Sequence, residues 1–158
     1  MSYLLDTNIF IRSKNELPMD IFHGFWQRLA ELARAGQIFS SVKVKEEIDR
    51  GNDELKQWCD EQLPKDFFLS FEAHAEYANL MTWANGNPVF TVPAKQEFAT
   101  VADAYLVATA AAKGMKVVTF ETSDPLCKKR VKIPDACIAL GVEYCSLNDV
   151  LHALKVVI

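Results

Sequence analysis

Short apolar runs alternate along this chain with longer segments whose apolar residues recur at helical spacing. The apolar runs predict strands over residues 2–5, 37–41, 117–120 and 143–146. After Pro64, residues 67–69 fit either another strand or an extended link. Helical spacing predicts helices over residues 21–35, 42–50, 53–63, 71–84, 103–113, 134–140 and 147–154. Strands that alternate with helices are typical of one α/β domain, here residues 1–158, whose parallel sheet carries helices on both faces.

Acidic residues stand at the ends of two of these predicted strands. Asp6 comes directly after the first strand, and Glu121 comes directly after the strand over residues 117–120. Asp103 begins an Ala-rich predicted helix. In open parallel sheets, ligands bind in the crevice at the carboxyl ends of the strands, so these acids could converge there. Clustered carboxylates repel one another unless a cation neutralises them, which implies a hard metal ion bound through oxygen.

Each of these acids also has a plain structural interpretation. Asp6 could cap the turn after the first strand, and Asp103 could be the N-cap of its helix. Glu121 follows a strand that should be central, whereas Asp124 precedes a proline and suits a turn. We therefore rank Glu121 above Asp124 as a site residue.

A further acid for the cluster comes from the charged helix over residues 42–50. Its charged stretch could simply be a solvated helix face. Val44 and Ile48 lie four residues apart and share the buried face, and Glu47 lies beside that face while Glu46 lies farther from it. We expect Glu47 rather than Glu46 to point inward.

The overall charge gives no support for nucleic-acid binding. The chain has 158 residues with 17 basic and 21 acidic side chains, and its net charge is −4. A clustered acidic site would itself lower this value, so phosphate contacts would depend on a local basic patch. The dense basic run contains Lys128, Lys129, Arg130 and Lys132. It is either a solvated loop or a loop that contacts phosphates beside the acids.

Cysteine spacing and the N-terminal segment indicate the compartment. The four cysteines show no Cys-x-x-Cys spacing, which argues against structural zinc and favours reduced, packed thiols. The chain starts with a polar residue and a strand, so we expect no signal peptide. No apolar run approaches the roughly 20 residues of a membrane span. We expect a cytoplasmic protein with no membrane partner.

Four short motifs together resemble the PIN-domain nucleases, a family that includes the VapC-type toxins of bacterial toxin–antitoxin pairs. In chain order they are Leu4-Leu5-Asp6-Thr7-Asn8, Glu46-Glu47-Ile48, Val101-Ala102-Asp103-Ala104 and Val118-Thr119-Phe120-Glu121. The resemblance spans nearly the whole chain. The segments at residues 20–26 and 131–135 are similar to a PIN-like branch of that family.

The resemblance implies a three-layer α/β/α sandwich with a central parallel sheet, and cleavage of single-stranded RNA with Mg²⁺ or Mn²⁺. It also implies a homodimer and a protein antitoxin encoded nearby. Matched motif by motif, the catalytic and metal-binding acids are Asp6, Glu47, Asp103 and Glu121. The residues that would bind substrate are Thr7, Asn8, Lys128, Lys129 and Arg130.

Two departures from the family keep alternatives open. The fourth acidic position is commonly Asp or Asn in the family and is the longer Glu121 here, and the basic character of many toxin nucleases is missing. A phosphatase of the haloacid dehalogenase type also starts with a strand that ends in Asp. Such enzymes usually need a second acid two residues later, where this chain has Asn8. A PIN-like binding module that keeps the acids only as structure is the other alternative.

Overall fold

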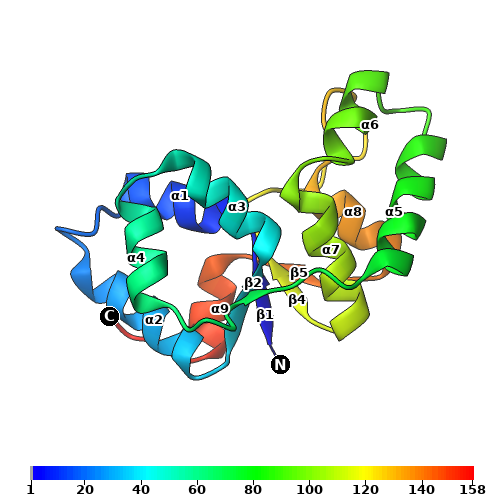
Figure 1. Ribbon diagram of the computed structural model, residues 1–158. Coiled ribbons are helices and arrows are strands. Elements are labelled where there is room, and N and C mark those ends of the chain that lie inside the picture. Colours follow the sequence, from blue (N-terminus) through cyan, green and yellow to red (C-terminus); the bar gives the residue numbers. More distant parts are fainter. Residues whose placement is uncertain (1) are drawn as a thin grey trace.

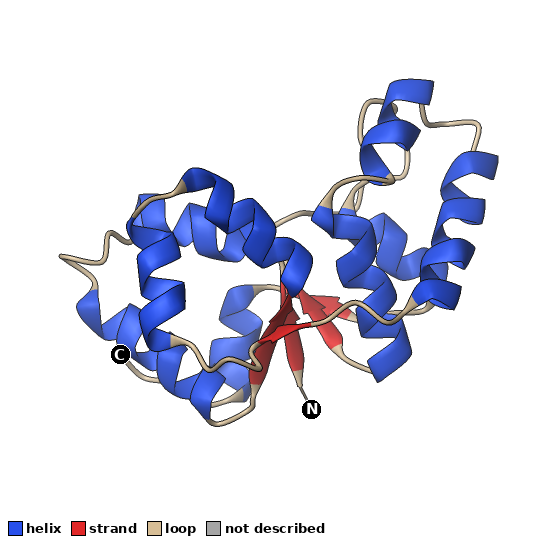
Figure 2. Ribbon diagram, viewed as in Figure 1, coloured by secondary structure: helices blue, strands red, loops and turns tan. Residues whose placement is uncertain are grey.

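A five-stranded parallel sheet lies between two groups of helices in the computed structural model, which describes residues 2–158 (Figure 1). The strands are β1 (Tyr3–Leu5), β2 (Ile38–Ser41), β3 (Phe68–Leu69), β4 (Lys116–Val118) and β5 (Tyr144–Cys145). The helices are α1 (Thr7–Glu16), α2 (His23–Arg34), α3 (Val42–Gly51), α4 (Glu54–Gln62), α5 (His74–Gly86), α6 (Val92–Phe98), α7 (Ala102–Lys113), α8 (Ile133–Leu140) and α9 (Leu147–Ala153). Helices α1, α2, α4 and α9 lie on one side of the sheet and α5, α7 and α8 on the other, and Figure 2 shows the strands between them. The predicted α/β/α sandwich is confirmed.

The order of the strands places a crevice at one edge of the sheet. The order is β3-β2-β1-β4-β5, and every neighbouring pair is parallel. In the centre, Leu4 pairs with Phe39 of β2 and with Val117 of β4. The strand order reverses between β1 and β4, and open α/β sheets commonly bind ligands at such a point, so we call the region beyond the carboxyl ends of these two strands the crevice. The central strands are apolar because both of their faces are buried under helices.

Two helices were not predicted from the sequence. Helix α1 follows Asp6 directly and buries Ile9 and Phe10. Its many polar residues conceal this narrow apolar stripe. Helix α6 has only 7 residues and starts at the N-cap Thr91, whose side chain accepts a hydrogen bond from the N–H of Ala94 at 3.3 Å. A helix this short offers too few turns for its periodicity to be recognised.

The end of β4 differs from the prediction. The strand ends at Val118, two residues before the predicted end at Phe120. The N–H of Thr119 still donates to the carbonyl of Cys145 at 3.0 Å, but the N–H of Glu121 donates to the Thr119 hydroxyl at 3.1 Å. This side-chain turn ends the strand and redirects the backbone at Glu121. The ambiguous segment after Pro64 is resolved as β3, which pairs with β2.

Two further features concern the length of the helices and the state of the cysteines. No helix within residues 2–158 combines the length and the apolar character that crossing a membrane requires. Cys59 and Cys137 are buried, Cys127 and Cys145 are half-buried, and all four thiols are free. Burial raises the pKa of both buried thiols to about 12, so these two cysteines stay protonated and unreactive near neutral pH.

Candidate active site

Asp6 lies at the floor of the crevice, between the ends of β1 and β4. Its N–H donates to the carbonyl of Val118 at 3.0 Å, and only 2% of the residue is exposed. Asp6 is the N-cap residue of α1, yet its side chain makes no capping hydrogen bond. The carboxylate instead accepts a hydrogen bond from the Thr119 hydroxyl at 3.2 Å. The capping interpretation therefore does not explain this carboxylate.

The surroundings of Asp6 disfavour its charge. The pKa of Asp6 is raised to about 8, chiefly by burial and also by the nearby carboxylates of Asp103 and Glu121, although hydrogen bonds from Thr119 and from the backbone of Thr7 act to lower it. Desolvation and like charge act together here, and the hydrogen bonds from Thr119 and Thr7 compensate for them only in part. Asp6 is thus a carboxyl group that would gain from a cation beside it.

Asp103 faces the same crevice from the first turn of α7. The N-cap of this helix is Val101, so Asp103 lies inside the helix and is not its cap. Its side chain is 13% exposed, and an Arg130 Nη2 atom lies 3.5 Å from its Oδ2. The pKa of Asp103 is raised to about 6, chiefly by burial and also by Glu121 and Glu47, although Arg130 acts to lower it. The two aspartates therefore share one desolvated, negatively charged environment.

Glu47 reaches the crevice from α3 and bonds to both of its walls. Its Oε1 accepts a hydrogen bond from the Thr7 hydroxyl at 2.6 Å, and its Oε2 accepts one from the N–H of Ala102 at 3.3 Å. Ala102 is the first residue of α7, so Glu47 satisfies a backbone donor that the N-cap residue leaves unpaired. Glu46 is exposed and lies 3.9 Å from Lys43 in an ion pair. Of the two glutamates, only Glu47 faces the other acids.

Glu121 closes the opposite side of the crevice and also meets a helix start. Its side chain is 9% exposed, and its Oε2 lies 3.2 Å from Arg130 Nη2. Its Oε1 accepts a hydrogen bond at 3.4 Å from the N–H of Ile133, the first residue of α8. Asp124 is exposed, and its backbone N–H donates to Asp135. Glu121, and not Asp124, is therefore the acid that joins the crevice from this loop.

Arg130, which was predicted to bind substrate, forms ion pairs with the acids of the crevice. One Nη2 atom bridges Asp103 and Glu121, and 41% of the side chain remains exposed. Its neighbours in the basic run, Lys128 and Lys129, are exposed and form no ion pair within residues 2–158. Of these three residues, Arg130 neutralises the acids, whereas Lys128 and Lys129 are free to meet another anion.

The other two predicted substrate-binding residues differ in their surroundings. Thr7 is buried and donates its hydroxyl to Glu47, so it orients that carboxylate. Asn8 is exposed on the first turn of α1, next to the crevice. Thr7 therefore acts on the acidic cluster itself, whereas Asn8 is accessible from solvent.

Two residues that organise the site were not singled out from the sequence. Thr119 joins Asp6 to the backbone of Glu121 through one hydroxyl. Asp135 is buried in α8, and its carboxylate accepts hydrogen bonds from the Ser123 hydroxyl at 2.5 Å and the Asp124 N–H at 2.9 Å. A Pro followed by Asp in the first turn of a helix was the available signal for Asp135.

The oxygen-rich donor set suits a hard divalent cation. Carboxylates and waters are the ligands of Mg²⁺ and Mn²⁺. Within residues 2–158, no three Asp, Glu, His or Cys side chains are gathered closely enough to hold a metal ion as they stand. Arg130 stands instead between two of the carboxylates, where it supplies a positive charge.

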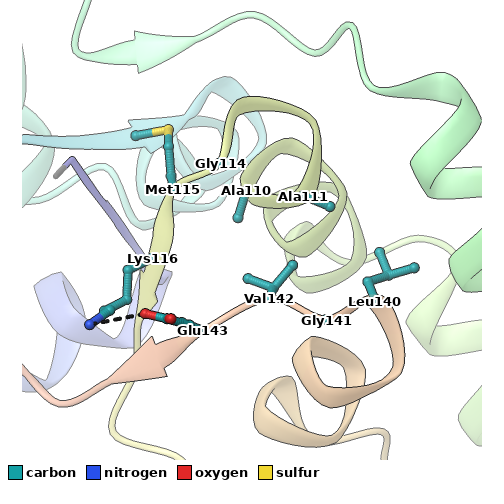
Figure 3. A pocket seen from close by; sticks show the side chains of 9 residues that line it. All are labelled: Ala110, Ala111, Gly114, Met115, Lys116, Leu140, Gly141, Val142 and Glu143. Carbon is teal, nitrogen blue, oxygen red and sulfur yellow. Dashed lines mark ion pairs between the residues drawn. The ribbon is translucent and has the colours of Figure 1, made fainter.

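A separate hollow lies at the opposite edge of the sheet. Its volume is about 220 Å³, and Figure 3 shows it between the end of α7 and the link from α8 to β5. Lys116 and Glu143 form an ion pair of 3.3 Å at its mouth. None of the crevice acids lines this hollow, so it is not part of the candidate active site.

Comparisons with known proteins agree with this architecture. A family model described as a domain of unknown function (DUF4411) matches residues 3–158. None of the curated proteins compared with the chain matches it. The crystal structure of VapBC2 from Rickettsia felis bound to a DNA fragment from their promoter has a similar fold, with a TM-score of 0.57 and 18% identity. The match covers 92% of this chain and 98% of that chain, and it supports a PIN-like fold.

Proposed function

The chain belongs to the family described as DUF4411, and we propose that it uses its PIN-like fold to cleave single-stranded RNA with the help of a divalent metal ion. The reaction is hydrolysis of a phosphodiester bond. It leaves a 5′-phosphate on one product and a 3′-hydroxyl on the other.

Asp6 is the observation that supports this proposal most directly. Its carboxylate is buried, lies near two other acids and caps no helix. A charge in this position destabilises the native state, so the packing of the fold does not explain why an acid is found at position 6. A role in binding a cation explains it.

We assign Asp6 and Asp103 as the main metal ligands, with Glu47 and Glu121 completing the site directly or through water. A bound Mg²⁺ or Mn²⁺ ion would polarise the phosphodiester, lower the pKa of the attacking water and stabilise the leaving oxygen. Glu47 and Glu121 are held in place by helix N-termini, so they also keep the walls of the crevice at a fixed separation.

The cations and the two polar residues of the opening motif would hold the RNA. Lys128 and Lys129 are exposed and can contact backbone phosphates. The exposed part of the Arg130 guanidinium lies beside two acids and can meet the phosphate that approaches them. Thr7 keeps Glu47 oriented, and Asn8 offers a neutral amide at the rim.

The biological setting that we propose is a toxin–antitoxin pair in the cytoplasm, with a homodimeric toxin. The similarity of fold to the VapBC2 structure, together with the four motifs, supports this setting. A protein antitoxin encoded next to this chain would then be its partner. A small DNA-binding protein in the neighbouring reading frame is the corresponding genetic observation.

Cleavage assays on the purified protein test the proposal. Single-stranded RNA should be cut in Mg²⁺ or Mn²⁺ and left intact in EDTA, and Asp6→Asn should abolish cutting while the protein stays folded. A phosphomonoester substrate serves as the comparison. Hydrolysis of the monoester without RNA cleavage would replace the proposal with a phosphatase, and the absence of both activities would leave a binding module.

A further inference from the structure

A second hollow lies on the far side of the loop that carries Glu121. Its volume is about 370 Å³, and its walls come from the end of α5, the loop after β4 and the outer face of α8. Trp83 and Phe90 form an edge-to-face pair at a centroid distance of 5.6 Å in its wall. Ile138 lies at its rim with 61% of the residue exposed. A large exposed aliphatic residue beside aromatic rings indicates a surface that an apolar ligand can cover.

Polar groups line the same hollow. Asn87 accepts a hydrogen bond from the N–H of Val89 at 3.0 Å through its Oδ1, and no hydrogen bond within residues 2–158 uses its amide nitrogen. Ser123 and the buried carboxylate of Asp135 lie in the wall as a bonded pair. An apolar, aromatic wall with a few fixed polar groups is the chemistry that recognises a planar heterocycle with polar edges.

The hollow is linked to the acidic crevice through one helical turn. At the start of α8, the N–H of Ile133 bonds Glu121, while Asp135 in the same turn holds Ser123 and Asp124. The crevice and the hollow therefore lie on the two sides of one anchored loop.

A basic segment of the chain runs from beside the hollow to the crevice. The carbonyl of Lys128 accepts a hydrogen bond at 3.1 Å from the N–H of Thr91, the residue that follows Phe90 in the hollow. The exposed Lys128 and Lys129 are therefore held close to the hollow, and Arg130 is held in the crevice. A chain with one planar base and a negative backbone matches this distribution of surfaces.

We propose that this hollow, the base pocket, binds the nucleobase of a nucleotide next to the bond that is cut in single-stranded RNA. The inference rests on the proposed function and adds a substrate contact to it. Lys128 and Lys129 would bind the backbone that joins the pocket to the crevice. The pocket would therefore determine which nucleotide is accepted beside the scissile phosphate.

Binding measured in EDTA tests the base pocket without cleavage. The probes are adenylate and uridylate octamers and an abasic ribose-phosphate octamer, which has the same charge and no bases. Base stacking on aromatic side chains predicts that at least one base-bearing octamer binds the wild type about tenfold or more tightly than the abasic octamer. Ala139→Trp, which fills the pocket from an exposed position on α8, should lower that affinity to the abasic level and leave abasic binding unchanged.

Matched variants separate the pocket from general effects. Ala153→Trp adds the same side chain at an exposed position of α9 and should bind all octamers like the wild type. Ile138→Gln is a milder second variant at the rim and should also weaken binding of the base-bearing octamer. Equal affinity of the wild type for the abasic and base-bearing octamers, or equal behaviour of Ala139→Trp and Ala153→Trp, would overturn the base pocket.

The proposed function and the base pocket fail in different ways. RNA cleavage in Mn²⁺ with no effect of Ala139→Trp on binding would remove the pocket and retain the nuclease. Binding that is sensitive to Ala139→Trp, without cleavage under any metal, would retain the pocket and remove the nuclease. A deoxyadenylate octamer in the same titration shows whether the pocket requires RNA or accepts single-stranded DNA.

Discussion

The surroundings of Asp6 favour the neutral, protonated form of its carboxyl group. The hydroxyl of Thr119 is its side-chain hydrogen-bond donor, and Asp103 and Glu121 add negative charge nearby. At neutral pH the native state must hold either a buried charge or an additional proton. Stability in the absence of metal should therefore depend on pH through this residue.

The direction of that dependence follows from the shift. The pKa of Asp6 rises from 3.8 to about 8 on folding, so the native state binds the proton more tightly than the unfolded chain does. The contribution of Asp6 is fully present below about pH 4 and is lost as the pH rises through about 8. Denaturant unfolding in EDTA from about pH 5 to about pH 9 should show a falling free energy of unfolding.

Asp6→Asn is the control for this prediction. The neutral amide cannot ionise, so the variant should be about as stable as the wild type near pH 5 and more stable near pH 9. Identical pH profiles for the two proteins would show that Asp6 does not titrate in this range.

Glu46 and Glu47 should differ in how much they contribute to the stability of the protein. Glu47→Ala removes a charged acceptor from the Thr7 hydroxyl and from the first N–H of α7, which should lower the free energy of unfolding by about 1–3 kcal/mol. Glu46→Ala alters an exposed ion pair and should change it by no more than about 0.5 kcal/mol. Denaturant titrations of both variants measure the difference, and equal losses would contradict the assignment of Glu47 as the inward-facing acid.

At the scale of elements, the connection over residues 119–132 is tied down at several points. Glu121 bonds the start of α8, Asp135 holds the backbone of Asp124, and the carbonyl of Lys128 accepts the N–H of Thr91. The lysines are thus displayed by an anchored segment. Phosphate contacts made from such a segment cost little ordering entropy on binding.

The exposed lysines of this connection can be tested separately from the acids. Replacing both Lys128 and Lys129 by Gln should weaken RNA binding and make the logarithmic salt dependence shallower by about 0.7–1 for each lost phosphate contact. Stability should stay within about 0.5 kcal/mol because both side chains are exposed and unpaired within residues 2–158. Binding titrations at several salt concentrations measure the slope. An unchanged slope would mean that the lysines do not touch RNA.

Arg130→Gln should behave differently from the lysine variants. It removes the cation that bridges Asp103 and Glu121, so in EDTA the variant should be less stable than the wild type. Thermal melts of the three proteins compare these effects directly. Loss of stability in the lysine variant alone would reverse the assignment.

The elements that could be predicted from the sequence are those with a strong local pattern. The central strands are short apolar runs because both of their faces are covered, and Asp6 could be placed at the sheet edge on that basis. Helix α1 was missed because its buried stripe is narrow. The pairing of Arg130 with Asp103 depends on the path of a long connection, which no local pattern encodes.

The two glutamates of α3 also show which features could be predicted from local sequence and which could not. Helical spacing distinguished Glu47 from Glu46, because facing on a helix is a local property. That Glu47 would satisfy a backbone donor of α7 could not be predicted, since these two residues are brought together only by the packing of α3 on α7. Long-range hydrogen bonds of this kind are a property of the assembled fold.

For the whole molecule, the fold and the proposed cation should be coupled. A metal ion that binds only the native state stabilises it by about 2.7 kcal/mol when its concentration is 100-fold above Kd. For a domain of this size that corresponds to an increase in Tm of about 5–10 °C. Melts in millimolar Mn²⁺ and in EDTA measure the shift, and Asp103→Asn should remove most of it. A Tm that does not change in millimolar Mn²⁺ would count against the metal site.

The hydrogen bonds of Glu47 and Glu121 also have an evolutionary consequence. These two acids support the starts of α7 and α8, whereas Asp6 supports no helix and destabilises the native state. In a lineage that no longer needed cleavage, substitutions of Asp6 would be neutral or favourable, while substitutions of Glu47 or Glu121 would still be purged. Inactive descendants of this fold should therefore lose Asp6 first and retain the glutamates longest. If the proposed function holds, Asp6 is therefore the residue whose retention depends most directly on selection for chemistry.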